Sequence, residues 1–477
     1  MNNILLWGLG ILVPGISMAA EKERPNIILI MVDDMGWGDV GFNGNTVIRT
    51  PCLDALASDG MVLERFYSAA PLSSPTRVSA LTGRHPFRTG VFSANVGRLG
   101  KGEVTIAELL KNEGYVTGLF GKWHLGTLTD KEIDANRARP KNKHLYNPPS
   151  WHGFDASFVT ESKVPTYDPM IQPAENDGNF WDYIHKGDSV RPYGTAYWDW
   201  NGARVTEDVS GNDSEVIIDR VLPFVDQSVG KDVPFFSVVW FHAPHLPCVA
   251  GPEHVAPYKD LDLQQRNYYG CITAMDEQVG RLVDYLKSKQ VYDNTIIFFC
   301  SDNGPELETP GSPGGFKGKK RSLYEGGIRV PSVMCWPAKI PGGSRSAVPS
   351  STLDYLPTLL DIIGASTGDH LTLDGESIWP KVLDKSGKRE KLMVFCSDRQ
   401  GAVVDGDYKL YYSKGNFEFY DIAQDPGEKN DISSQYPEKK EKLTNYLKQN
   451  VEDYRQSFEK MRTEDSIDWQ EWWNIWK

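Results

Sequence analysis

Several strongly apolar segments of this chain end abruptly in charged or amide side chains, and this feature restricts the possible folds more than any other. Residues 26–32 form a continuous run of β-favouring apolar residues, which is typical of a strand buried on both faces of a parallel sheet. Similar runs occupy residues 115–120, 235–241 and 295–300, and helical patterns lie between them at about residues 51–60, 105–114, 215–225 and 272–286. This alternation predicts an α/β fold with a large doubly wound mixed sheet flanked by helices.

The polar residues that follow these four strands are expected to meet. In doubly wound sheets, sites form outside the carboxyl ends of the strands. The residues that follow the strands are Asp33 and Asp34, then Lys122 and His124, then His242 and His245, and finally Asp302 and Asn303. Buried carboxylates are costly unless they are neutralised, and a hard cation with oxygen ligands is their natural partner, although a solvated acidic turn is the simpler alternative. Together the groups predict a metal-assisted site for a sulfate or phosphate ester.

Residues 71–84 carry the pattern of a helix that begins beside an anion. Ser73 or Ser74 can act as the N-cap, Pro75 suits the first turn, and Gly83 suits the end of the helix. The free N–H groups and the positive end of the helix dipole favour an anion, and Arg77 follows one turn later. An ordinary capped helix is the alternative interpretation of this segment.

The N-terminus and the composition indicate an exported protein. Residues 1–20 resemble a secretory signal peptide, with an apolar run too short for a comfortable membrane span and small residues before a charged segment. We therefore expect a periplasmic or secreted protein without a membrane anchor after cleavage. The net charge of −13 disfavours nucleic acid as a partner. Most of the six cysteines lie in apolar runs and are expected to be buried thiols, although one or two disulfides remain an alternative.

The chain divides into a large and a small predicted unit. We expect a main domain at residues 21–385 and a smaller α+β unit at residues 386–477, with a short antiparallel sheet and a helix at about residues 438–454. Its Trp-rich tail, residues 469–476, is expected to pack on the main domain, with contact to a sugar as the alternative. Residues 127–210 form an aromatic-rich insertion, which is typical of a functional or self-packed loop region. As a substrate wall it offers Asp168, Arg191, Trp198 and His152 as candidate contacts, although at least half of its rings are expected to pack against one another.

Taken together, the motifs resemble those of the type I, formylglycine-dependent sulfatases of the alkaline-phosphatase-like superfamily. The resemblance extends from about residue 25 to residue 432. Its central motif is Ser73-Ser74-Pro75-Thr76-Arg77, continued by Leu81-Thr82-Gly83-Arg84. The other matching segments are Val32-Asp33-Asp34, Gly121-Lys122-Trp123-His124, Pro244-His245, Ser301-Asp302-Asn303-Gly304, and Lys320 ahead of Tyr324-Glu325-Gly326-Gly327.

This resemblance implies a cofactor, a modification and a set of roles. A maturation enzyme would oxidise Ser73 to formylglycine, and a calcium ion would be held by Asp33, Asp34, Asp302, Asn303 and the modified Ser73. Arg77, Lys122 and Lys320 would neutralise the sulfate oxygens. His245 or Lys320 would protonate the leaving alcohol, and His124 would take a proton from the hydrated aldehyde.

The implied reaction is hydrolysis of a sulfate ester, and a sulfated carbohydrate such as a glycosaminoglycan or a mucin-type glycan is the expected substrate. Many relatives carry cysteine where this chain has Ser73. Serine occurs in bacterial members matured by an anaerobic radical enzyme, and a deliberate Cys-to-Ser replacement would look the same. Two alternatives remain: a phosphomonoester or phosphonate hydrolase of the same superfamily, and a non-catalytic binder of sulfated glycans with unmodified Ser73.

Overall fold

The structure is a computed structural model that describes residues 24–176, 180–368, 371–384, 387–461 and 470–476. The predicted signal peptide therefore lies outside the described residues. Within those ranges, no helix combines the length and the apolar character that crossing a bilayer requires.

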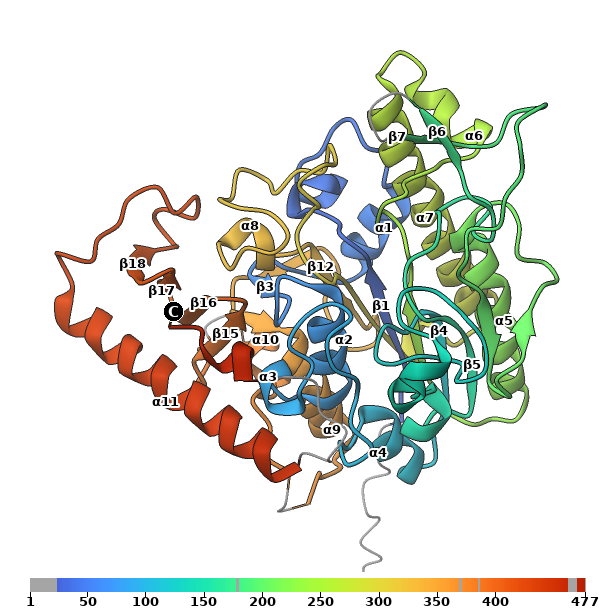
Figure 1. Cartoon of the computed structure of the whole chain (residues 1–477). Coiled ribbons are helices and arrows are strands. Elements are labelled where there is room, and N and C mark those ends of the chain that lie inside the picture. The colour runs from blue at the N-terminus through green and yellow to red at the C-terminus, as the bar shows by residue number, and fades with distance from the viewer. Residues whose placement is uncertain (1–23, 177–179, 369–370, 385–386, 462–469, 477) are drawn as a thin grey trace, which may run out of the picture.

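A ten-stranded mixed sheet forms the centre of the molecule (Figure 1). From one edge to the other its strands are β13 (Ser344–Ser346), β2 (Met61–Leu63), β12 (Ser332–Cys335), β11 (Thr295–Ser301), β1 (Asn26–Val32), β10 (Phe235–Trp240), β4 (Val116–Lys122), β5 (Ala156–Thr160), β8 (Tyr197–Asp199) and β9 (Arg204–Val205). The five strands from β11 to β5 are parallel, and antiparallel neighbours flank them on both sides. The predicted mixed sheet is confirmed, with the four apolar runs adjacent at its centre.

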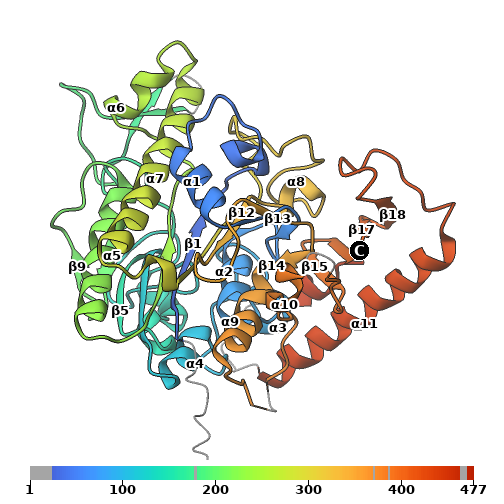
Figure 2. The same ribbon diagram turned by 180° about the vertical axis from the view of Figure 1, so that it is seen from behind.

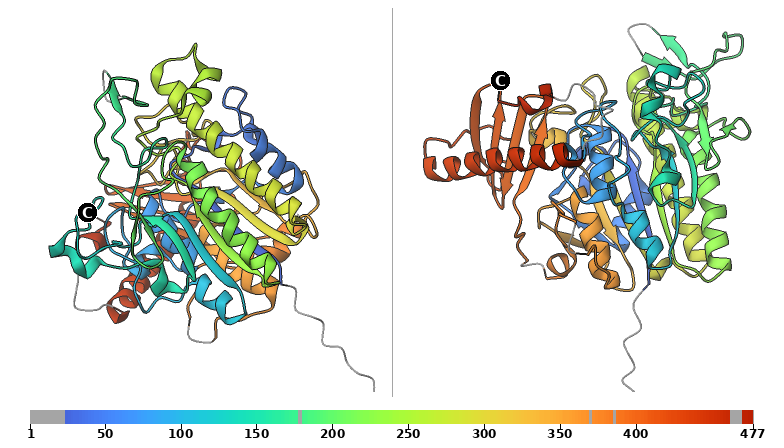
Figure 3. Two further views of the ribbon diagram at one scale, coloured as in Figure 1. Left: turned by 90° about the vertical axis from the view of Figure 1, so that its right-hand side faces the viewer. Right: turned by 60° about the horizontal axis from the view of Figure 1, so that its bottom comes forward.

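Helices cover both faces of this sheet (Figures 1 and 2). One layer contains α1 (Pro51–Asp59), α5 (Asp213–Gly230) and α7 (Leu263–Ser288), and α5 and α7 run side by side (Figure 3, left). The other layer contains α2 (Ser73–Thr82), α4 (Ile106–Asn112), α9 (Tyr355–Ile363) and α10 (Trp379–Leu383). The strands explain this arrangement, because apolar residues on both faces of β1 need a cover on each side.

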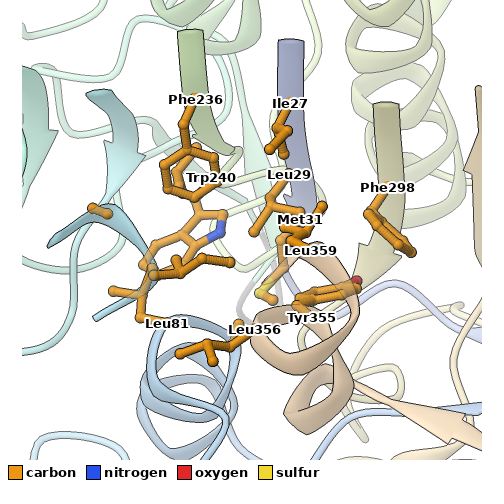
Figure 4. Packing of buried hydrophobic residues seen from close by; sticks show 14 of the residues in the cluster. Ile27, Leu29, Met31, Leu81, Phe236, Trp240, Phe298, Tyr355, Leu356 and Leu359 are labelled. Carbon is orange, nitrogen blue, oxygen red and sulfur yellow. The ribbon is translucent and has the colours of Figure 1, made fainter. Parts of the chain in front are cut away.

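Strand β1 divides its side chains between two hydrophobic cores. Ile27, Leu29 and Met31 pack towards α2 and α9 (Figure 4), whereas Ile28 and Ile30 pack with α5 and α7 on the other face. This alternation follows from the two-residue period of a strand. Each fully buried aliphatic side chain of this kind stabilises the fold by about 1.5–3 kcal/mol.

Several helix limits differ from the prediction. Helices α5 and α7 begin earlier and end later than the apolar period indicates. The earlier starts arise because the side chains of Asn212 and Asp262 act as N-caps, accepting hydrogen bonds from backbone N–H groups in polar first turns. Helix α2 has Leu72 as its N-cap, so the prediction that Ser73 or Ser74 caps it is wrong; Gly83 does end the helix, at φ +64°. The described cysteines are all free thiols, five of them buried and Cys52 half-buried.

The C-terminal part of the chain forms a second, four-stranded antiparallel sheet. It consists of β15 (Met393–Ser397), β16 (Gln400–Asp405), β17 (Tyr408–Ser413) and β18 (Asn416–Asp421), with α11 (Pro437–Met461) along one face (Figure 3, right). In the Trp-rich tail, Trp473 packs edge-on against Phe87 and Phe92 of the main domain, as predicted, whereas Trp469 lies outside the described residues.

A buried ion cluster joins this small sheet to the main domain. The Lys409 ammonium group on β17 lies 2.9 Å from a carboxylate oxygen of Glu325 and 2.9 Å from one of Glu428, and all three side chains are buried. Glu325 belongs to α8 (Glu325–Ile328), which follows the main-domain loop that carries Lys320. Tyr67 donates a further hydrogen bond to Glu325 at 2.9 Å. The cluster therefore holds the small sheet against the loops at the carboxyl edge of the large one.

We expect Lys409→Met to destabilise the protein by about 3–5 kcal/mol, because it leaves two carboxylates in a buried site without their cation. Urea and thermal unfolding midpoints measure the effect. The same substitution at the exposed Lys442 should change the free energy of unfolding by less than about 0.5 kcal/mol. Adding Glu325→Gln and Glu428→Gln should recover part of the loss; no recovery would mean that lost packing, and not uncompensated charge, causes it.

Candidate active site

The carboxyl ends of β1, β10 and β11 are joined by backbone hydrogen bonds that extend beyond the strands themselves. The Asp33 N–H donates to the Ala243 carbonyl and the Asp302 N–H donates to the Val32 carbonyl, each at 3.0 Å. The Asp34 N–H then donates to Oδ1 of Asp302 at 3.1 Å. The predicted meeting of the two acidic strand ends is thus observed, with Asp33, Asp34 and Asp302 fully buried.

Three basic side chains lie against these three carboxylates. Lys122, at the end of β4, lies 2.5 Å from Asp33 Oδ2. Arg77 donates to Asp302 Oδ2 at 3.0 Å and lies 3.4 Å from Asp33 Oδ2. The side chains of Arg77 and Asp302 are completely buried. The Arg77 guanidinium group also lies over the Trp240 ring, 4.9 Å from its centroid.

The third cation is Lys320, which donates to Asp34 Oδ2 at 2.6 Å and lies 3.3 Å from Glu306. Although burial favours the neutral amine, Asp34 and Asp33 hold the pKa of Lys320 well above its ordinary value. The group is therefore charged throughout the physiological range.

The carboxylates differ in how readily they hold their charge. Burial works against ionisation of Asp33, yet Lys122 and the neighbouring cations hold its pKa well below the ordinary value. Burial and the charge of Asp33 raise the pKa of Asp302 to about 7, and burial raises that of Asp34 as well. The cations present on the chain thus leave two of the three carboxylates only partly compensated.

The donor set suits a hard divalent cation. Asp33, Asp34, Asp302 and Asn303 offer oxygen atoms from three carboxylates and one amide, the ligand type that calcium takes. Asn303 donates through Nδ2 to Asp34 Oδ1 at 2.7 Å, and its own Oδ1 is buried with no hydrogen-bond donor among the described residues. An unpartnered buried acceptor beside incompletely compensated carboxylates is the arrangement that a bound cation would satisfy.

Ser73 lies at the edge of this acidic group. Its Oγ donates to Asp33 Oδ1 at 3.2 Å and lies 3.4 Å from the Lys122 ammonium nitrogen. Ser73 is the first residue of α2, and Arg77 follows four residues later, so both project from the same face of the helix. The fold therefore places a hydroxyl group, two cations and a carboxylate within one hydrogen-bonded cluster.

His124 faces the same region from the loop after β4. It has φ +56°, and its main chain is held by a 2.7 Å hydrogen bond from Ser74 Oγ to the His124 carbonyl and by a 2.9 Å bond from the His124 N–H to the Glu161 carbonyl. Nε2 is 3.0 Å from Asn95 Oδ1, whereas Nδ1 is buried and has no partner in the part of the chain that the structure describes. Burial and the charge of Lys122 lower the pKa of His124 well below its ordinary value, so the ring is neutral and able to accept a proton.

The two histidines after β10 have different positions. His245 Nε2 lies 3.5 Å from Asp34 Oδ2, and Nδ1 donates to the Leu246 carbonyl at 2.6 Å. Burial and the Lys320 charge lower the pKa of His245 well below its ordinary value. His242 is instead bonded to Thr160 and Asp213 in the interior, at 2.7 and 2.8 Å, and does not line the cavity.

A cavity of about 720 Å³ opens onto this cluster. Ser73, Lys122, His124, His245 and Lys320 line its inner part. Trp472 of the Trp-rich tail also lines the cavity, and so do residues that no sequence pattern indicates, among them Asn95, Lys163, Arg399 and Lys414. They lie in loops and turns without a motif of their own, and no periodic pattern marks them.

The four candidate substrate contacts of the insertion lie outside this cavity. His152 is fully buried against Asn147, and Trp198 is buried with its indole N–H donating to Asp134 at 2.9 Å. Asp168 accepts a hydrogen bond from the Gly211 N–H, and Arg191 is exposed. The insertion instead adds β8 and β9 to the sheet, and rings such as Tyr197 and Trp198 are buried in the two hydrophobic cores of the main domain.

Comparisons with known proteins agree with this site. The sulfatase family profile matches residues 25–365, and the profile of the N-sulphoglucosamine sulphohydrolase C-terminal region matches residues 314–457. The chain is 31% identical over 416 residues to N-acetylgalactosamine-6-sulfatase of Canis lupus familiaris, which covers 83% of this chain and 73% of the relative. It is 30% identical over 452 residues to arylsulfatase G of Rattus norvegicus, covering 86% and 81%.

A solved structure has the same fold. The crystal structure of Ps i-CgsB in complex with k-i-k-neocarrahexaose superposes with a TM-score of 0.75 at 30% identity, covering 89% of this chain and 92% of the other. Sequence and structural similarity thus extend over most of the chain, including the strand ends that carry the site. The chain belongs to the sulfatase family of sulfuric ester hydrolases, within the alkaline-phosphatase-like superfamily.

Proposed function

We propose that this sulfatase removes sulfate from a sulfated carbohydrate, with Ser73, oxidised to formylglycine, as the source of the nucleophile. The observation that carries the proposal is the position of Ser73 Oγ, between Asp33 and the Lys122 ammonium group and in the wall of an open cavity. An unmodified serine hydroxyl is a weak nucleophile without an adjacent base. Oxidation would give an aldehyde whose hydrate supplies a hydroxyl group for attack on sulfur.

A calcium ion is the proposed cofactor. Asp33, Asp34, Asp302, Asn303 and the modified Ser73 would hold it, and its charge would stabilise the negative charge that develops on the sulfate oxygens. The unpartnered Asn303 Oδ1 and the raised pKa of Asp302 support this assignment.

The protein's own cations prepare the site for a sulfate group. Lys122 and Lys320 line the cavity, and Arg77 lies directly behind Asp33 and Asp302. Because these groups are fixed by buried ion pairs, little reorganisation is needed when charge develops on the substrate. In this scheme Lys122 and Lys320 contact sulfate oxygens, and Arg77 fixes the carboxylates and the nucleophile that they surround.

Two protein groups handle the protons. Nδ1 of His124 has no partner among the described residues, and burial and Lys122 keep the ring neutral, so Nδ1 is free to accept a proton from the hydrated aldehyde. His245 is the proposed acid for the leaving alcohol, with Lys320 as the alternative. The Leu246 carbonyl fixes a proton on Nδ1 of His245, so Nε2 is the atom that would carry the transferred proton. A bound sulfate ester would favour the protonated ring through its negative charge.

The proposed substrate is a sulfated sugar of the glycosaminoglycan or mucin type. One relative is named for N-acetylgalactosamine 6-sulfate, and the similar crystal structure holds an oligosaccharide. The cavity has the size of a carbohydrate site and mixes charged, amide and aromatic side chains. Because residues 1–20 resemble a signal peptide, we propose that the enzyme acts in the periplasm or outside the cell.

The first prediction concerns Ser73. In a host that carries a serine-type maturation enzyme, the peptide containing Ser73 should be about 2 Da lighter than encoded, since oxidation removes two hydrogens. The same preparation should release sulfate from a sulfated hexosamine, and Ser73→Ala should release none. An unmodified Ser73 in that host would favour the glycan-binder alternative, and faster release of phosphate than of sulfate would favour the phosphohydrolase alternative.

The second prediction concerns the cation. Calcium at about 100 times its Kd should stabilise the protein by about 2.7 kcal/mol relative to a chelated sample, measured as a rise in Tm. Asp302→Asn should remove most of this increment, whereas Asp260→Asn, an exposed change of the same kind, should keep it. An equal increment in both variants would place calcium elsewhere on the protein.

The third prediction separates the two candidate acids. His245→Ala should lower kcat on a sugar sulfate by about 10²–10⁴. The loss should be much smaller on 4-nitrophenyl sulfate, whose leaving group needs no proton. Lys320→Met should lower both rates to a similar extent if Lys320 only binds sulfate. The reverse pattern, with Lys320→Met sensitive to the leaving group and His245→Ala not, would assign the acid to Lys320.

A further inference from the structure

The outer part of the cavity is formed by the small C-terminal sheet. The turn between β15 and β16 and the turn between β17 and β18 both contribute lining residues, Ser397–Gln400 and Ser413–Lys414. The two turns are adjacent, because Gln400 pairs with Ser397 on one side and with Ser413 on the other. The end of the second sheet that carries these two turns therefore faces the cluster around Ser73.

This edge is firmly attached to the catalytic loop. The Gln400 side chain donates to the Arg321 carbonyl at 2.9 Å and accepts from the Leu323 N–H at 3.0 Å. Tyr411 donates to the same Gln400 oxygen at 3.2 Å. Since Arg321 directly follows Lys320, these bonds fix the position of the turns relative to Lys320, whose ammonium group is bonded to Asp34.

The turns present two cations with little to neutralise them. Arg399 and Lys414 are exposed at the tips of the adjacent turns, with φ of +52° and +47°. The only ion pair of Arg399 within the described residues is with its neighbour Asp398, at 3.9 Å and with both side chains largely exposed. Lys414 has neither an ion pair nor a side-chain hydrogen bond within the part of the chain that the structure describes.

The remaining charges of the outer wall do not provide partners for these two cations. Glu306 is already paired with Lys320 and Arg321. Glu308, two residues after Glu306, also lines the cavity, and Lys163 adds a further cation from the loop after β5. On a chain with a net charge of −13, exposed cations with at most one weak ion pair, gathered at the mouth of one cavity, indicate an anionic ligand.

An aromatic ring lies in the same wall. Trp472 lines the cavity, and its ring is stacked on Phe92 with centroids 5.8 Å apart and planes 8° from parallel. A ring supported in this way can hold the apolar face of a sugar at low entropic cost, because its orientation is already fixed.

We propose that Arg399 and Lys414 form a second anion-binding subsite, which takes the carboxylate or sulfate group of the sugar next to the one that loses its sulfate, with that neighbouring ring on Trp472. The inference rests on the proposed function and narrows it: the substrate is an acidic oligosaccharide with a further charged group beyond the scissile sulfate. Charge-assisted hydrogen bonds from Arg and Lys would read that group.

The test compares four substrates that share one scissile group. These are N-acetylgalactosamine 6-sulfate alone, and the same sugar linked to a neutral hexose, to a uronic acid or to a second sulfated hexosamine. The wild-type enzyme should show a higher kcat/KM on the two acidic disaccharides than on the neutral one. Preference for the uronic acid would identify a carboxylate as the ligand, and preference for the second sulfate would identify a sulfate. Equal rates on all three disaccharides would contradict the subsite.

The double variant Arg399→Ala/Lys414→Ala should lower kcat/KM on the preferred acidic disaccharide by about tenfold or more, mainly through KM, since each lost charged contact is worth about that factor. Its effect on the monosaccharide should be several times smaller. The charge-matched control Lys231→Ala/Lys259→Ala changes two exposed lysines outside the cavity and should leave all four rates unchanged. A uniform loss on every substrate would contradict a separate subsite.

Calorimetric titration of the same four sugars into Ser73→Ala protein measures the subsite without turnover. Tighter binding of an acidic disaccharide, weakened about tenfold by the Arg399 and Lys414 substitutions, would support the subsite even if no sulfate were released. Such binding by the Ser73→Ala protein, together with no sulfate release by the matured wild-type enzyme, would overturn the proposed function alone. Equal binding of the acidic and neutral disaccharides would overturn the subsite alone.

Discussion

The structure depends on a cluster of buried carboxylates and basic side chains that pair with one another at the carboxyl ends of the central strands. Asp33, Asp34 and Asp302 have no contact with solvent, and each lies against Arg77, Lys122 or Lys320. Removing such groups from water costs several kcal/mol per ion, and this desolvation cost is offset only by close, well-oriented partners. The parallel order of β11, β1, β10 and β4 places their carboxyl ends side by side and so brings these partners together. The topology of the sheet therefore determines the geometry of the site.

The same charges explain why helix α2 departs from ordinary capping rules. Ser73 and Ser74 have the side chains of good N-caps, yet neither caps the helix. The Ser73 hydroxyl is bonded to Asp33 and that of Ser74 to the His124 carbonyl. Both hydroxyl groups therefore form hydrogen bonds within the site and none with the first turn of the helix. The missing side-chain cap costs about 1 kcal/mol of helix stability. Such a local conflict is typical of functional positions.

This contrast also shows what the sequence could and could not predict. Burial of residues 26–32 and 295–301, and the polar residues after them, follow from pattern alone, because parallel strands end at one edge. Positions such as Lys163, Arg399 and Lys414 reach the cavity only through the packing of the insertion and of the second sheet. Nothing local distinguishes them from other surface cations. His152 and Trp198 show the opposite case: residue types suited to a sugar site that the fold uses for internal packing.

The division of the cavity between two sheets has a consequence for how specificity can change. The groups that surround Ser73 come from strand ends and helix α2 of the large sheet, where one displaced charge would disturb the whole buried set. The outer wall comes from turns of the small sheet, whose position is held by Lys409 beneath and Gln400 beside them. Exposed turn residues such as Arg399 and Lys414 can be replaced without altering those anchors. The fold therefore lets the recognition of neighbouring sugars vary while the groups around the sulfate stay in place.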